Sequence, residues 1–123
     1  MTVLTFLFVT CLTGVVGIGC RKEAGPPSAL AAEQIPTEFA QGFKDAKPEV
    51  KDLADKTLKA LEAKDYPAAH QVVQELMVAA SGNKSQQLLA TRAFLTVTDL
   101  LQKAREQGDE KAAEAIKIYQ STK

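Results

Sequence analysis

The segments LEAKDYPAAHQVV (residues 61–73) and AREQGDEKAAEAIK (residues 104–117) have the same layout. Each ends a helix-forming stretch, passes through a tight acidic turn and continues with a pair of alanines. At an offset of 44 residues, Asp65 in the first segment matches Asp109 in the second. Aspartate is a preferred N-cap, and small residues such as alanine let two helices approach closely across a turn. The two segments therefore predict two helical hairpins, each turning at its aspartate.

The rest of the chain after residue 36 also has the composition of helix. It is rich in Ala, Leu, Lys, Glu and Gln, and it contains no run of alternating β-branched residues. Apolar residues recur three and four positions apart, and the expected helices begin at Thr37, Pro48, Asp65, Asn83 or Ser85, and Asp109. Gly82 is expected to end the third helix in a left-handed conformation. The fourth helix, over residues 86–107, has the broadest apolar face and is the expected spine of the fold.

The octapeptide EAKDYPAA (residues 62–69) resembles the helical hairpin of tetratricopeptide repeats. The chain departs from that family because its internal offset is 44 residues rather than about 34, and because the aromatic and proline positions of the full repeat are absent. The predicted fold is all-α, as either two tetratricopeptide-like helical hairpins or a small antiparallel helical bundle over residues 37–120. The arrangement also resembles small exported helical proteins of uncharacterised bacterial families, a likeness that implies no activity.

The N-terminus differs from this helical part. Residues 3–19 carry no charge and are dominated by large apolar side chains, and their length is at the low end of what spans a bilayer as a helix. An apolar N-terminal run that ends in small residues is typical of a secretory signal peptide, although no Lys or Arg precedes it. We therefore expect residues 1–19 to be a signal peptide. The alternative is an uncleaved membrane anchor, for which Arg21 and Lys22 would favour a cytoplasmic domain.

The run Val16-Gly17-Ile18-Gly19-Cys20 resembles the lipobox of bacterial lipoproteins, in which small residues precede a cysteine at the end of the apolar core. Gly17 departs from the pattern, because the family usually has leucine at that position. The resemblance implies that the thiol of Cys20 receives a diacylglycerol and that the signal is cut just before it. The protein would then be held on a membrane of the bacterial cell envelope. Ordinary signal cleavage, which would leave Cys20 as a free terminal thiol, is the alternative.

Residues 20–36 are mostly small or polar and are interrupted by glycine and proline, a composition that cannot bury a core. We expect this stretch to be a flexible tether between the lipidated N-terminus and the helical domain, residues 37–120. Since Cys11 lies inside the expected signal, the mature chain would keep one cysteine and have no disulfide framework.

Few residues point to chemistry. Lys plus Arg and Asp plus Glu number 15 each, and the lack of a basic excess argues against a nucleic-acid partner. His70 is the only histidine, and we interpret it as a boundary residue at the edge of an apolar face rather than a metal ligand. The sequence contains no phosphate loop, nucleophile elbow or paired-carboxylate cluster. We therefore expect no enzyme activity, no cofactor, no metal and no small-molecule substrate.

These observations favour a lipid-anchored helical module that binds another protein at the cell envelope. Leu88 and Leu95 lie off the main apolar face of the longest predicted helix, and they are the candidate contact residues. The alternative is a structural or self-associating helical spacer without a groove. The exposure of Leu88 and Leu95 separates the two hypotheses. If both are exposed they would mark a contact patch, whereas a neighbouring helix that covers them would favour the spacer.

Overall fold

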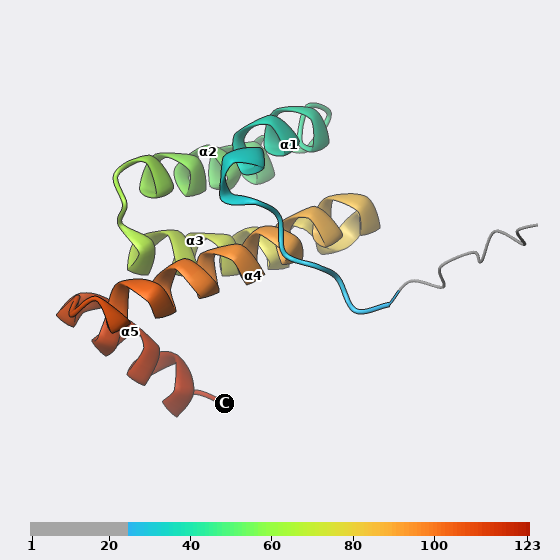
Figure 1. The fold of residues 1–123 in the computed structure, drawn as a ribbon. Helices are drawn as coiled ribbons and strands as arrows, with labels where there is room; N and C mark the ends of the chain where they lie inside the picture. The colour runs from blue at the N-terminus through green and yellow to red at the C-terminus, as the bar shows by residue number, and fades with distance from the viewer. Residues whose placement is uncertain (1–24) are drawn as a thin grey trace, which may run out of the picture.

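The computed structural model describes residues 25–123, and Cys20 and the expected signal peptide lie outside them. The described part is all-helical, which confirms the predicted fold class, and no strand occurs within it (Figure 1). Its elements are η1 (Ala32–Gln34), α1 (Ile35–Gly42), α2 (Pro48–Glu62), α3 (Tyr66–Ala79), η2 (Ala80–Gly82), α4 (Lys84–Glu106) and α5 (Glu110–Ser121).

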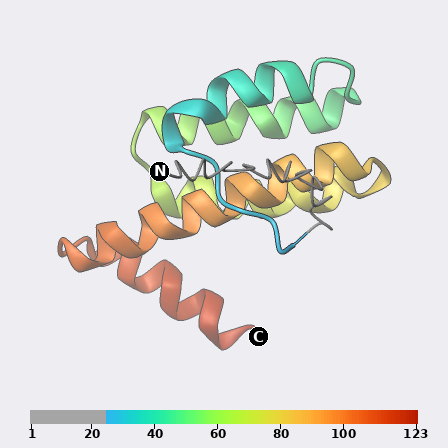
Figure 2. The same cartoon turned by 45° about the vertical axis from the view of Figure 1, so that its right-hand side comes forward.

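The helices form a small bundle built around α4. Helices α2 and α3 pair as a hairpin, and α4 lies along α3 (Figures 1 and 2). Helix α1 lies beside α2 and packs on α4, whereas α5 leaves the end of α4 at an angle on the opposite side. Since α4 contacts α1, α3 and α5, the prediction that the longest helix is the spine is confirmed.

The two turns that the sequence singled out have the same geometry. In each, the aspartate amide donates a hydrogen bond to a carbonyl five residues earlier, at 2.9 Å for Asp65 and 3.0 Å for Asp109. The preceding residue has a positive φ, 54° at Lys64 and 93° at Gly108, which together with that bond makes a Schellman C-cap. Each aspartate side chain then accepts a bond from the amide three residues onward, at 3.2 and 3.1 Å, and caps the next helix as predicted.

The likeness between the two segments ends after the turns. Ala69 is buried, but its counterpart Ala113 is exposed, whereas Ala112 is buried and its counterpart Ala68 is partly exposed. Helices α3 and α5 therefore turn different faces inward. The two hairpins share a turn and not a packing arrangement.

The core consists of two clusters. The larger one joins α1, α2, α3 and the first part of α4, and includes Ile35, Phe39, Val73, Leu76 and Val97. The smaller one joins the end of α4 to α5, and consists of Leu101, Ala104, Ala112 and Ile116, with Tyr66 and Ala115 packed against it.

The packed region begins before Thr37, which corrects the expected boundary between tether and domain. Leu30 and Ile35 are buried in the larger cluster, and Thr37 is an exposed residue inside α1 rather than its cap. The hydroxyl of Thr96 on α4 donates a hydrogen bond to the carbonyl of Leu30 at 2.6 Å. Helix α1 begins at Ile35, and Pro36 therefore lies in its first turn. A proline is tolerated there because the backbone N–H that it lacks would have no partner within the helix.

Gly82 does not take the expected left-handed conformation. It ends the short 3-10 turn η2, and Gly108 is the only glycine of residues 25–123 with a positive φ. The chain reverses at Asn83 instead, whose backbone is extended and whose side chain accepts a hydrogen bond from the amide of Gln86 at 3.1 Å. Asn83, and not Ser85, is therefore the N-cap of α4. The connection between α3 and α4 contains no residue with a positive φ.

Candidate functional site

The two leucines singled out in the sequence lie on the outer face of α4. Leu88 is 50% exposed and Leu95 is 36% exposed, so both side chains remain accessible to solvent. Since they are seven residues apart, they lie on the same side of the helix, away from the core. This exposure meets the condition set for a contact patch, and their contact with a partner stays a prediction.

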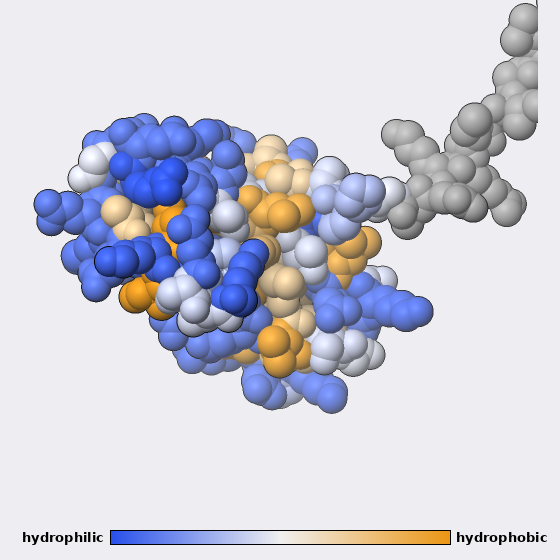
Figure 3. Space-filling view, turned by 90° about the horizontal axis from the view of Figure 1, so that it is seen from below, coloured by the Kyte–Doolittle hydropathy of each residue, from blue (hydrophilic) through white to orange (hydrophobic). Residues whose placement is uncertain are grey.

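A second apolar surface lies along α3, with one part facing α5 and the other facing α4. Two adjoining hollows of about 530 and 460 Å³ share Gln74 and Tyr119 in their walls. We call this surface the α3–α5 groove, and its main residues are His70, Met77, Val78, Phe94, Ile118 and Tyr119. Figure 3 views the molecule from the side on which α5 lies, and hydrophobic atoms run through the middle of that face between hydrophilic ones.

Large aliphatic side chains stand open to water in both parts of this groove. Val78 on α3 is 75% exposed and Ile118 on α5 is 58% exposed, and they lie in the two hollows that meet at Tyr119. None of the described residues that line the two hollows is charged. An open apolar surface without charge is typical of a surface that another molecule covers.

Helical spacing explains how the groove forms. His70, Gln74 and Val78 follow one another at intervals of four and share a side of α3. On α5, Ile118 and Tyr119 face the same space, which stays open because α5 diverges from α4 (Figure 1). The sequence reasoning missed Val78 and Ile118, although the criterion that found the two leucines on α4, an apolar residue beside the main stripe, applies to them as well.

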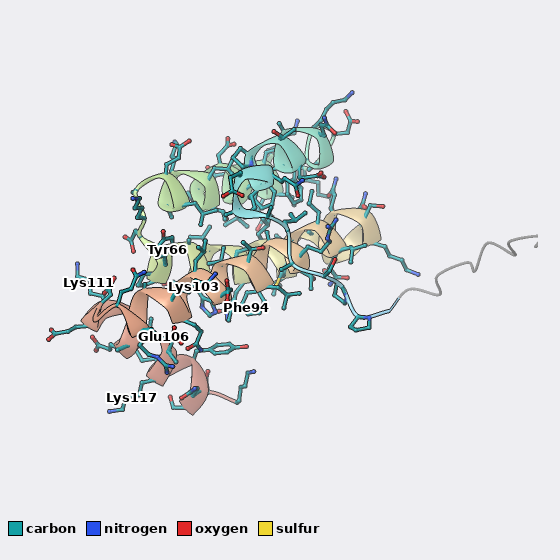
Figure 4. The ribbon with its side chains drawn as sticks, viewed as in Figure 1. Tyr66, Phe94, Lys103, Glu106, Lys111 and Lys117 are labelled. Carbon is teal, nitrogen blue, oxygen red and sulfur yellow. The ribbon has the colours of Figure 1, made fainter. Side chains whose placement is uncertain are left out.

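An aromatic cluster lies where the two hollows of the groove meet. The ring of His70 lies 5.1 Å from that of Phe94 and 5.0 Å from that of Tyr119, measured between centroids, and the latter pair is edge-to-face. Phe94 projects from α4 on the side of α5 (Figure 4). One ring from each of three helices therefore meets at a single point.

His70 is a buried residue, which corrects its interpretation as a boundary residue. It is only 6% exposed, and its Nε2 is buried without a hydrogen-bond partner. Burial holds the pKa of His70 below its ordinary value of 6.5, because the charged imidazolium would lose its hydration. The sequence could not show this burial, since the covering rings of Phe94 and Tyr119 come from other helices.

A third hollow, of about 620 Å³ between α2 and α3, adjoins the groove, because Gln74 and Val78 line it as well. Its walls include Glu49, Asp52, Lys56 and Glu75. Asp52 and Lys56 form an exposed ion pair of 2.7 Å along α2, an arrangement that helix surfaces commonly carry at little gain in stability. This hollow therefore places water-exposed charge beside the apolar side chain of Val78.

The described residues also bear on metals and membranes. Within residues 25–123, no three His, Cys, Asp or Glu side chains come together in a way that could hold a metal ion. No helix of that part of the chain is long and apolar enough to cross a bilayer. Comparison with models of protein families, with curated proteins and with solved structures finds no match to this chain.

Proposed function

We propose that the protein is a lipid-anchored helical module of the bacterial cell envelope that binds a segment of another protein in the α3–α5 groove. The observation that carries this proposal is the exposure of Val78 and Ile118 on the two sides of Tyr119. Burying apolar surface contributes about 25 cal/mol per Å², so covering such side chains favours association.

The shape and charge of the groove favour an amphipathic helix as the bound segment. Its two adjoining hollows lie along α3, between α5 on one side and α4 on the other, and proteins that bind a helix through its apolar face also do so in a groove between helices. Because its lining residues are uncharged, the inner face of the partner helix would carry apolar side chains and no charge. Gln74, which lines both hollows, offers one side-chain amide that can orient the bound helix by a hydrogen bond.

The lipid anchor rests on a separate argument. Cys20 follows an uncharged apolar run and stands at the position of the lipidated cysteine in lipoproteins. Two or more acyl chains on this residue would hold the protein stably at a bilayer, whereas a single chain binds only reversibly.

Photo-crosslinking in the native cells tests the groove. A photoreactive phenylalanine analogue is placed at Val78 or Ile118 in the groove, at Leu88 on the outer face of α4, or at the exposed Ala113 of α5 as the matched control. We expect a discrete product from the two groove positions and none from the control. The bound protein is then identified by mass spectrometry and its affinity is measured with purified components.

Three other results would contradict the groove proposal. A product from Leu88 alone would move the contact to the outer face of α4. A product with twice the mass of the chain would favour the self-associating spacer. The absence of any product at both Val78 and Ile118 would remove the support for a partner helix in the groove.

A further inference from the structure

Helix α5 is held to the rest of the molecule at two separate places. Its first half packs through Ala112 and Ile116 against Leu101 in the smaller core cluster. Its second half contacts the bundle through Tyr119, which lies against the rings of His70 and Phe94. The aromatic part of this second attachment therefore has a histidine at its centre.

The contact offers no hydrogen-bond acceptor to Nε2 of a charged imidazole. A protonated histidine carries two N–H donors, and the buried Nε2 of His70 has no acceptor within reach. The groups that face it are Gln71 and Gln74 from α3, Phe94 from α4, and Tyr119 from α5. No carboxylate lines this hollow among the described residues, and the ammonium of Lys123 lies 4.6 Å from the centroid of the Tyr119 ring.

Protonation would consequently weaken the docked position of α5. The faces of the two aromatic rings attract a cation, but this attraction replaces only part of the lost hydration of a buried charge. Movement of Tyr119 away from His70 would expose Nε2 to water and restore that hydration. Because Ala112 and Ile116 hold the first half of α5 in the smaller core cluster, this movement is confined to the part of α5 that follows Ile116.

We propose that His70 is a pH-sensitive latch, whose protonation releases the second half of α5 from α3 and α4 and so widens the α3–α5 groove. This inference concerns the free protein and does not depend on the proposed function. The direction follows from linkage: the docked state keeps His70 neutral, whereas the released state exposes it to water. For each pH unit below the ordinary histidine pKa, the ratio of released to docked protein thus rises by up to about tenfold. The rise ends at the pH at which His70 is protonated in the docked state as well.

The composition of the chain supplies two specific probes. His70 is its only histidine, so the histidine ring signals in a nuclear magnetic resonance spectrum of the untagged full chain in neutral detergent belong to this residue. Only two tyrosines occur, Tyr66 and Tyr119, so incorporation of 3-fluorotyrosine gives two fluorine signals, which Tyr66→Phe assigns. Tyr119 reports on the latch, whereas Tyr66 packs against the smaller core cluster.

The titration runs from about pH 7.5 to pH 5, the range in which histidine changes charge. We expect the His70 ring and the Tyr119 fluorine to change together below the ordinary histidine value, while the Tyr66 signal and the helical circular dichroism stay constant. In His70→Phe, which keeps a ring and cannot titrate, the Tyr119 signal should not change with pH. His70→Gln, which is polar and also cannot titrate, provides the same test if the Phe variant does not fold.

Three outcomes would overturn the latch. The Tyr119 signal could stay constant while His70 titrates, which would show that charge is tolerated in the docked state. The Tyr66 and Tyr119 signals could change together with loss of helix, which would show global unfolding instead of a local release. The pH response of Tyr119 could persist in both His70 variants, which would assign it to another group.

Discussion

Gly108 lies in the turn between α4 and α5, and its replacement by alanine tests the geometry of that turn. An L-residue in the left-handed region costs about 1–2 kcal/mol, and a φ of 93° lies well beyond the centre of that region. Alanine also reduces the conformational entropy of the unfolded chain, and this effect raises the free energy of unfolding by about 0.4–1 kcal/mol. We therefore expect Gly108→Ala to lower the free energy of unfolding by about 1 kcal/mol.

Gly82 provides the matched control. Its φ is not positive, and a Cβ built there meets no other atom within 4 Å. Gly82→Ala should therefore keep only the gain from the unfolded state and raise the free energy of unfolding by up to about 1 kcal/mol. The two variants, which make the same chemical change, should thus shift stability in opposite directions.

Urea unfolding followed by circular dichroism measures both variants against the parent chain in the same neutral detergent. Each kcal/mol corresponds to a change of about 4–8 °C in Tm for a domain of this size, so a thermal scan gives an independent reading. Equal stabilisation by both alanines would refute the reasoning, because Gly108 would then have no need of its left-handed backbone.

Three further predictions concern the core, the anchor and acid stability. Leu101→Ala should lower the free energy of unfolding by about 2–5 kcal/mol, since Leu101 is buried, whereas Leu88→Ala should change it by about 0.5 kcal/mol or less; comparable losses in urea unfolding would mean that the buried face is misassigned. Cys20→Ser should block lipid attachment and processing, and an unmodified soluble chain beginning at Cys20 in intact-mass spectrometry of the parent would contradict the anchor. Stability should fall as the pH drops below 6.5, by at most about 1.4 kcal/mol per pH unit from His70, and an unchanged slope in urea unfolding of His70→Phe would contradict this.

The features that sequence could predict depend on atoms close together along the chain. Asp65 and Asp109 cap helices through amides three residues away, so a local pattern is sufficient to locate both turns. Pro48 begins α2 for a similar reason, because its ring presets the first turn. The apolar stripes follow from helical spacing alone and predict which face of each helix is buried.

The features that sequence could not predict depend on surfaces distant in the chain. Leu30 stands among prolines and small residues, and its burial requires α4, where the hydrogen bond from Thr96 spans 66 residues. His70 lies at the edge of its own apolar stripe and becomes buried because Phe94 on α4 and Tyr119 on α5 cover it. Composition and periodicity describe one element at a time, so they assigned Leu30 to a tether and His70 to a boundary.

The earlier start of the packed region also changes what a lipid on Cys20 would do. The carbonyl of Ser28 accepts a hydrogen bond of 3.0 Å from Nε of Arg92, so the chain is attached to α4 from Ser28 onward. Eight residues from Cys20 to Ser28 span at most about 29 Å when fully extended, roughly half the reach of the tether expected over residues 20–36. A lipid at Cys20 would therefore keep the domain close to the bilayer.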